Sequence, residues 1–458
     1  MNRIAKRTWS AMVLALLLFA GLVFFVCEFV TKSKDWVLED DSPHVYDEEE
    51  KLSCGAVTDR DGILLLNAND GRVYSSDAEI RKSTVHWVGD TYGMIYAPVV
   101  PYYSEQLLDY DVFNGIYHYG DTGAVAHLTL SAYVQEVALE AMGSYKGTVA
   151  VYNYETGEIL CAVTTPSFDP ETPPDVEGDV GAENEGLYYN RFTQGQYIPG
   201  SIFKIVTLAA VLEEFPEITQ ETFSCTGSCT YGPDEITCED VHYNQTLQQA
   251  FRNSCNCVFA QLAERLGPER LRYYVEKFGV LDSISFDGVQ TATGNFDISD
   301  AMDAGVAWSA IGQHRDQINP CAFMTFMGAI AGGGQGVQPH IMDSITAGRQ
   351  TTYQATTVVR EPIISQATAE ILRTYLRSNV SEKYGDSNFN GLSVCAKTGT
   401  GEVGGDKKPN AMFTGFVTNS EYPLAFIICV EDAGYGGRVC IPIASQVLQA
   451  CTTAMDGQ

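Results

Sequence analysis

The chain has 458 residues, of which 45% are hydrophobic and 11% aromatic, a composition typical of folded proteins and too long for one ordinary core. We therefore expect two folded domains with appended segments. Its 58 acidic residues against 28 basic ones give a formal net charge of −30, which repels phosphate backbones and argues against any nucleic-acid partner.

An uncharged apolar segment lies near the N-terminus, at residues 8–27, and three basic residues stand among the first seven. Twenty residues span about 30 Å as a helix, enough to cross the hydrocarbon core of a bilayer. Because basic flanks stay in the cytoplasm, the sequence predicts a cytoplasmic tail at 1–7, a single-pass cell-membrane anchor at 8–28 and an extracytoplasmic remainder. A cleaved signal peptide would need a shorter apolar core and a small-residue cleavage site.

The segment after the anchor divides into an acidic linker at 29–51 and a spacer domain at 52–126. The linker contains the run from Asp40 to Glu50, whose charges favour a solvated segment. In the spacer, Asp61-Gly62 separates two apolar runs, which is the pattern of a β-hairpin. We therefore expect a mostly β pedestal with little chemistry of its own.

The second predicted domain covers residues 127–458. Ser131 opens a helical pattern, and residues 147–154 and 158–163 have the pattern of a hairpin. Three strand-like runs and a final helical run follow near the C-terminus, at 392–396, 411–418, 424–431 and 441–454. Since strands stand at both ends with helices between them, we expect an α/β sandwich whose sheet joins the two ends.

The strongest chemical signal is Ser201-Ile202-Phe203-Lys204, which opens an apolar helical run after Pro199-Gly200. Residues three apart share a helix face, so we expect Ser201 and Lys204 within hydrogen-bond reach. A serine becomes a nucleophile when a base takes its proton, and lysine can act as that base when burial lowers its pKa from about 10.4. Taken alone, the motif is equally an N-cap serine beside a surface lysine.

Two further polar motifs follow in the chain. Ser254 and Asn256 interrupt two helical patterns, where Ser254 can relay a proton and Asn256 can hold a lysine and a substrate amide. Lys397-Thr398-Gly399-Thr400 follows a strand-like run, where a lysine and two hydroxyls suit a carboxylate and the glycine admits a substrate backbone. Each motif alone is also consistent with a plain helix corner or strand end.

The ordered set Ser-x-x-Lys, Ser-x-Asn, Lys-Thr-Gly is far more specific, and β-lactamases and penicillin-binding proteins carry it. Together with Thr156-Gly157-Glu158, the Pro166–Pro170 turn and Tyr189-Asn190-Arg191, it makes the chain resemble a class B penicillin-binding protein, of the penicillin-binding protein A-like kind. The likeness runs from about Cys54 to Cys451. It implies the penicillin-binding transpeptidase fold, which is serine β-lactamase-like, with the site between a helical part and a five-stranded sheet.

The resemblance implies a peptidoglycan D,D-transpeptidase that needs no cofactor or metal. Ser201 would attack the penultimate D-Ala carbonyl of a stem peptide, and Lys204 would accept its proton. Ser254 would pass a proton to the leaving amine, with Asn256 positioning Lys204 and the substrate. The acyl group would then pass to an amine of a neighbouring strand, and β-lactams would acylate the same serine.

The third motif would bind the substrate. Lys397 and the hydroxyls of Thr398 and Thr400 would hold the terminal carboxylate, and Gly399 would lie beside the peptide. Backbone N–H groups of Ser201 and Thr400 would stabilise the oxyanion. The resemblance also implies a partner glycosyltransferase that supplies nascent strands.

Other functions use the same motifs. A D,D-carboxypeptidase would have water as the acceptor, and a β-lactamase would be a shorter released domain with a deacylating base, which the sequence does not reveal. A β-lactam sensor or a silent scaffold of the wall machinery is the non-enzyme alternative. A sensor would carry a signalling domain, and a dead scaffold would have lost Ser201 or Lys204.

Thirteen cysteines is a high count for this length. Cys225, Cys229, Cys238 and His242 form the pattern C-x3-C-x8-C-x3-H, which loosely imitates a zinc site. Zinc modules have tighter and more regular spacings, so we expect a Cys225–Cys238 disulfide or unpaired thiols instead.

Overall fold

The computed structural model describes residues 2–37, 55–69, 71–108, 110–111, 116–117, 123–174, 181, 184–231, 234–298 and 303–457. The acidic run from Asp40 to Glu50 lies outside these residues, as does most of the predicted linker.

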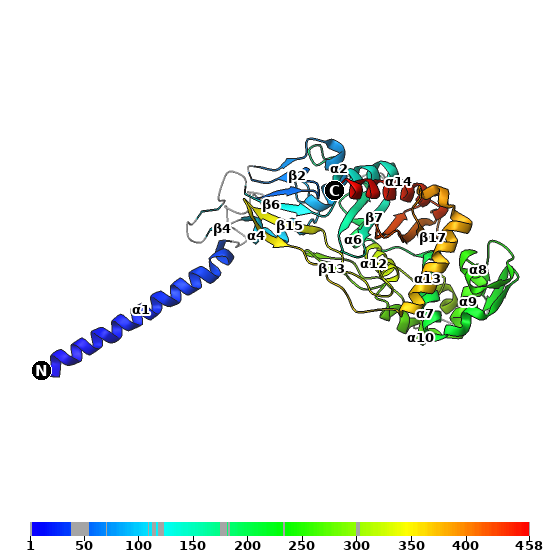
Figure 1. The fold of residues 1–458 in the computed structure, drawn as a ribbon, viewed down its shortest axis with the longest axis horizontal. Helices are drawn as coiled ribbons and strands as arrows, with labels where there is room; N and C mark the ends of the chain where they lie inside the picture. Colours follow the sequence, from blue (N-terminus) through cyan, green and yellow to red (C-terminus); the bar gives the residue numbers. More distant parts are fainter. Residues whose placement is uncertain are drawn as a thin grey trace.

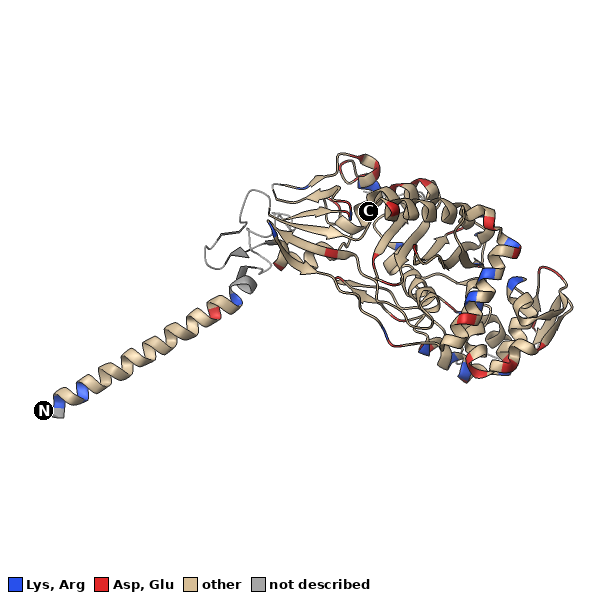
Figure 2. Cartoon of the chain, in the orientation of Figure 1, with Lys and Arg blue, Asp and Glu red and all other residues tan. Residues whose placement is uncertain are grey.

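The N-terminal segment forms one long helix, α1 (Asn2–Val37). Its stretch from Arg3 to Lys32 is long and apolar enough to cross a membrane, and none of its most apolar part is buried against the rest of the protein. Figure 2 shows charged residues near both ends of α1 and an uncharged middle. By length and composition, α1 therefore fits a single-pass membrane anchor.

A five-stranded antiparallel sheet forms the centre of the molecule, in the order β17-β18-β19-β7-β8. Its members come from the two ends of the predicted domain: β7 (Gly147–Asn153), β8 (Ile159–Thr165), β17 (Val394–Gly401), β18 (Asn410–Val417) and β19 (Leu424–Val430). β19 pairs with β7 from Leu424 opposite Asn153 to Val430 opposite Gly147. The predicted sheet joining both chain segments is therefore confirmed.

Helices cover both faces of this sheet, which explains why its strands are nearly continuous apolar runs. One face packs against α5 (Ala132–Met142) and α14 (Gly436–Asp456), and the other against α12 (Pro320–Ala331). Ser131 is the N-cap of α5, as the sequence predicts, and accepts a hydrogen bond from the Val134 N–H. Figure 1 shows α14 running along the top of the sheet.

A mainly helical part lies beyond the β17 edge of the sheet (Figure 1). It comprises α7 (Lys204–Glu214), α8 (Leu247–Arg252), α9 (Asn256–Leu266), α10 (Pro268–Lys277) and α13 (Gln366–Asn379). Four short strands project from it as two antiparallel pairs, β9 (Thr222–Cys225) with β12 (Tyr243–Thr246), and β10 (Ser228–Tyr231) with β11 (Asp234–Thr237).

A second sheet lies toward the anchor and has the order β16-β15-β6-β1-β2-β3. β1 (Ala56–Thr58) and β2 (Leu64–Asn67) form the predicted hairpin, in which Gly62 adopts a φ of +81° that favours glycine. The sheet continues through β3 (Val73–Tyr74) and β6 (Ala124–Leu128) to two strands from much later in the chain, β15 (Met342–Ala347) and β16 (Gln350–Gln354). The sheet thus crosses the boundary placed at residue 127, and a separate spacer over 52–126 stays a prediction.

The remaining described elements are short, apart from α2. They are α2 (Ala78–Val88), α3 (Val99–Tyr102), α4 (Ser104–Leu108), β4 (Tyr110–Asp111), β5 (Ile116–Tyr117), α6 (Arg191–Gln194), β13 (Ser285–Phe286), β14 (Val289–Gln290) and α11 (Asp303–Ser309).

Candidate active site

Ser201 lies in a 3₁₀ turn, Gly200–Ile202, that leads directly into α7. Gly200 has a φ of +52°, and a Cβ at this position would lie 2.2 Å from the Thr400 carbonyl oxygen. Only glycine permits both the conformation and this approach. The turn that carries Ser201 therefore packs backbone to backbone against β17, which carries the third motif.

Lys204 begins α7 and is fully buried. Its Nζ lies 2.6 Å from the Ser254 carbonyl oxygen, 2.6 Å from Asn256 Oδ1 and 3.1 Å from Ser254 Oγ. The amine also lies 5.6 Å from the centre of the Phe259 ring. Burial lowers the pKa of Lys204 to about 7, so that the neutral amine, which can accept a proton, is well populated at neutral pH.

Ser254 lies in the turn between α8 and α9, where the sequence predicts a break between two helices. Its φ of +56° is a left-handed conformation that is uncommon for a residue other than glycine. Ser254 Oγ lies 2.9 Å from Ser201 Oγ and 3.1 Å from the Nζ atoms of both Lys204 and Lys397. A hydroxyl has one donor and two acceptor positions, so these three neighbours satisfy it completely.

Ser201 and Lys204 do not meet as the sequence predicts. Among the described contacts there is no direct hydrogen bond between them. Lys204 Nζ instead donates to the Ser254 carbonyl oxygen and to Asn256 Oδ1. Ser254 Oγ instead contacts both residues. The expected direct contact is therefore wrong, and Ser254 bridges the serine and the lysine.

Asn256 is the first residue of α9, and both ends of its amide are engaged. Oδ1 accepts a hydrogen bond from Lys204, and Nδ2 donates one to the Thr237 carbonyl at 2.7 Å. The side chain thus links the buried lysine to the end of β11.

Lys397 lies on β17 and is also fully buried. Besides Ser254 Oγ, its Nζ contacts the Thr398 carbonyl oxygen at 3.4 Å and lies 5.7 Å from the centre of the Phe251 ring. Burial lowers the pKa of Lys397 well below its ordinary value, and the nearby Lys204 lowers it further. Because like charges disfavour one another in a buried site, a proton on one lysine opposes a proton on the other.

Thr398, Gly399 and Thr400 complete the third motif on β17. Side chains alternate along a strand, so Thr398 lies on the face opposite Lys397. Its hydroxyl is 3.1 Å from Tyr384 Oη, which also accepts a hydrogen bond from the Thr398 N–H at 3.2 Å. The Thr398 hydroxyl, expected to bind the carboxylate, is thus engaged by a residue that sequence reasoning missed.

Gly399 and Gln313 explain how β17 is held beside Ser201. A Cβ on Gly399 would lie 2.8 Å from the Pro199 carbonyl oxygen, so this glycine admits the Ser201 turn. Gln313 Nε2 donates to the Thr400 carbonyl at 2.8 Å, and Gln313 Oε1 accepts from the Glu402 N–H at 3.2 Å. Gln313 lies outside every motif, and no pattern in the sequence points to it.

The model of the family described as penicillin binding protein transpeptidase domain matches residues 147–449, more than half of the chain and all three motifs. The chain belongs to this transpeptidase family. Its fold is the penicillin-binding transpeptidase fold that the sequence predicts, and the family makes it an enzyme of the serine acyltransferase type.

Two relatives show which kind of penicillin-binding protein the chain resembles. Stage V sporulation protein D of Bacillus subtilis is 30% identical over 322 residues, which cover 66% of this chain and 48% of that protein, so the chain spans about half of that relative's length. Peptidoglycan D,D-transpeptidase PbpA of Mycolicibacterium smegmatis is 27% identical over 369 residues, 72% of each chain. The chain is thus a class B, PbpA-like penicillin-binding protein.

Solved structures show the same fold. Penicillin-binding protein A of Mycobacterium tuberculosis, solved as a ceftriaxone acyl-enzyme complex, has a TM-score of 0.76 and 23% identity, covering 90% of this chain and 99% of that one. The D,D-transpeptidase domain of a peptidoglycan glycosyltransferase from Eggerthella lenta gives a TM-score of 0.76 and 24% identity, with 88% and 99% covered.

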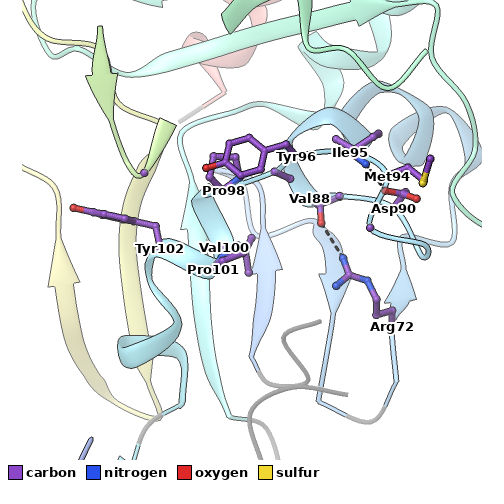
Figure 3. Close-up of a pocket in the computed structure, with 14 residues that line it drawn as sticks. Arg72, Val88, Asp90, Met94, Ile95, Tyr96, Pro98, Val100, Pro101 and Tyr102 are labelled. Atoms are coloured by element: carbon purple, nitrogen blue, oxygen red, sulfur yellow. Dashed lines mark hydrogen bonds between the residues drawn. The ribbon is translucent and has the colours of Figure 1, made fainter. Parts of the chain in front are cut away.

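One cavity of this penicillin-binding protein lies away from the motif residues. It encloses about 570 Å³ between Arg72, the end of α2, residues 93–102 and Gly288 (Figure 3). Tyr96, Ile95 and Val100 make its wall largely apolar, and Arg72 is held there by a 2.9 Å hydrogen bond to the Val88 carbonyl. None of the predicted catalytic residues lines it.

Of the two arrangements expected for Cys225 and Cys238, a disulfide or unpaired thiols, the structure has unpaired thiols. Cys225 and Cys238 have no disulfide, and their Sγ atoms lie 3.7 Å apart, well beyond the bond length of about 2.05 Å. Both thiols instead meet His242 and Cys255, whereas Cys229 lies outside this group. The C-x3-C-x8-C-x3-H pattern contains only residues that are close in sequence. In the fold, Cys255 of the Ser-x-Asn turn lies beside Cys225, Cys238 and His242.

Proposed function

We propose that the chain is a membrane-anchored peptidoglycan D,D-transpeptidase that acts through a Ser201 acyl-enzyme. The observation that carries the proposal is the set of contacts on Ser254 Oγ, which joins Ser201 Oγ at 2.9 Å and the two buried lysine amines at 3.1 Å. A nucleophile, a relay hydroxyl and a base of lowered pKa are the components that acyl transfer requires.

Acylation would begin with neutral Lys204. The Ser201 hydroxyl gives its proton to Ser254, and Ser254 passes its own proton to Lys204 Nζ, since hydroxyl protons can rotate between partners. Ser201 Oγ bonds to the penultimate D-Ala carbonyl, and the oxyanion forms beside the backbone N–H groups of Ser201 and Thr400. Collapse breaks the peptide bond, and the leaving D-Ala amine takes the proton back through Ser254.

Lys397 would bind the terminal carboxylate of the substrate or of a β-lactam. A carboxylate beside Lys397 favours its charged form. That charge in turn disfavours a proton on Lys204, because the two amines share Ser254 as a neighbour. Substrate binding would therefore set the base in its reactive form. Gly399 and Thr400 would lie along the bound peptide.

The second half of the reaction would use an amine from a neighbouring stem peptide as acceptor. We expect the cleft to be bounded by residues 165–190 and 401–409, so that a bound acceptor competes with water. The test offers the purified chain a thioester analogue of the stem peptide together with a D-amino acid. Exchange product should exceed hydrolysis product at saturating acceptor, whereas predominant hydrolysis would identify a D,D-carboxypeptidase. Acylation without turnover would indicate a sensor.

We place this reaction outside the cytoplasmic membrane, beside a glycosyltransferase that supplies new strands. The proposal is supported by α1 and by the basic residues that precede its apolar stretch. A tag before Met1 should be protected from protease in intact cells and a tag after Gln458 should be cleaved. The opposite pattern would contradict this topology.

A further inference from the structure

Four side chains of metal-ligating type meet beside the Ser-x-Asn turn: Cys225, Cys238, His242 and Cys255. Each can offer one ligand atom, and these atoms all lie within 4.8 Å of one another. Cys225 and Cys255 are buried, and Cys238 and His242 are half-buried. The reaction proposed above uses none of the four.

The group is assembled from separate elements. Cys225 ends β9, Cys238 follows β11, and His242 directly precedes β12. β9 and β12 pair with Cys225 opposite Tyr243, which brings His242 beside Cys225. Cys255 comes from the turn between α8 and α9. The fold thus directs three cysteines and one histidine to a single point.

Three of the six distances within the group match the edges of a tetrahedral zinc site. The Sγ atom of Cys238 lies 3.7 Å from that of Cys225 and 3.7 Å from that of Cys255, and Cys225 Sγ lies 3.6 Å from His242 Nδ1. Zn–S bonds of about 2.3 Å and Zn–N bonds of about 2.0–2.1 Å, at tetrahedral angles, separate two sulfurs by about 3.8 Å and sulfur from nitrogen by about 3.6 Å.

A disulfide explains the positions of these sulfur atoms less well than a zinc ion does. A disulfide joins two sulfurs at about 2.05 Å and leaves the others unchanged. Here Cys238 Sγ has two cysteine neighbours of the group at 3.7 Å and the Cys257 sulfur, outside the group, at 3.5 Å, and it accepts a hydrogen bond from the Cys257 N–H at 3.4 Å. Such N–H donation to a cysteine sulfur is what a metal-bound thiolate attracts.

We propose that Cys225, Cys238 and Cys255 through their sulfurs and His242 through Nδ1 bind one Zn²⁺ ion. Three thiolates and one imidazole form a closed four-coordinate set, which is typical of zinc that holds structure and is not exposed to substrate. Zn²⁺ binding would release the thiol protons and keep these cysteines from oxidation outside the membrane.

The ion would position the catalytic turn. Cys255 stands between Ser254 and Asn256, so ligation of its sulfur fixes the backbone on which both side chains depend. Ser254 has a left-handed φ that its surroundings must maintain. Asn256 Nδ2 donates to the carbonyl of Thr237, the residue before Cys238. Zinc would thereby set the position of the two groups that hold Lys204.

The first test measures zinc in the full-length chain, purified in detergent with reductant, by elemental analysis. We expect about one zinc per chain, and loss of zinc in Cys225→Ser and in His242→Ala, which lie outside the catalytic residues. Cys229→Ser is the matched control on the same hairpins and should keep its zinc. Absence of zinc from the wild type, or a Cys225–Cys238 disulfide in its peptide map, would overturn the site. Retention of zinc by both ligand variants would do the same.

The second test concerns positioning, and this part rests on the proposed function. Removing zinc with a chelator should slow acylation by a fluorescent penicillin by about 10- to 100-fold, since a displacement of about 1 Å can cost that much. Added Zn²⁺ should restore the rate. An unchanged rate after zinc loss would overturn the positioning role. Zinc-loaded wild type that is never acylated would contradict the proposed function while leaving the metal site intact.

Discussion

The proposed catalytic group and the cavity beside α2 lie in different regions and are lined by different kinds of side chain. The catalytic group buries two lysine amines around one serine hydroxyl, at the crossing of the Ser201 turn, the Ser254 turn and β17. The cavity beside α2 encloses about 570 Å³ of mostly apolar wall, and its arginine binds a backbone carbonyl. We therefore expect the reaction where buried amines of lowered pKa gather and not at the cavity.

The largest expected effect comes from removing the base. Lys204→Ala should slow acylation of Ser201 by a β-lactam by about 10²–10⁴-fold, because general-base assistance is typically of that size. Stopped-flow acylation rates measure this loss. Lys277→Ala, which removes a half-exposed lysine of α10 paired with Glu213, is the control and should react at the wild-type rate. Equal acylation rates for the two variants would show that Lys204 is not the base.

The pH dependence of the acylation rate tests whether Lys204 reacts as the neutral amine. Burial lowers the pKa of Lys204 to about 7, and the reaction needs the unprotonated amine. The acylation rate should therefore rise with pH, by about tenfold per unit well below pH 7, and level off above about pH 8. The residual reaction of Lys204→Ala should lack this profile. A rate that falls as pH rises through 7 would mean that the protonated amine is the active form.

The smallest effect is expected in the cavity. Arg72→Ala removes the hydrogen bond to the Val88 carbonyl and should lower the free energy of unfolding by about 1 kcal/mol. Its acylation rate should stay within about twofold of the wild type, since the cavity shares no lining residue with the catalytic group. Denaturant unfolding and acylation kinetics on one preparation check both values. A large loss of acylation rate would show that the two regions are coupled.

The sequence was sufficient to find the three motifs and the strands of the central sheet, because motif spacing and apolar runs are local features. Ser201 and Lys204 are three residues apart, and β17 to β19 are consecutive apolar runs. Contacts made by residues outside the motifs were not predictable from the sequence. Gln313 and Tyr384 carry no motif, yet each holds β17 by hydrogen bonds to its backbone.

Pairing over long sequence separations explains the other differences. β15 and β16 join the N-terminal sheet through β6, more than two hundred residues away, and no turn signal indicates this register. Cys255 lies in the Ser-x-Asn turn by sequence. In space it lies beside Cys225, Cys238 and His242. The spacing of cysteines in the sequence could not show that the Ser-x-Asn turn brings Cys255 near Cys225 and Cys238.

The most direct test of the account is the position of a β-lactam adduct on the intact chain. After incubation with penicillin and denaturation, the mass of the wild type should rise by that of one antibiotic molecule. Peptide mapping should place the adduct on Ser201, and Ser201→Ala should show none. An adduct on another residue, or none on the folded wild type, would contradict the claim that Ser201 is the nucleophile.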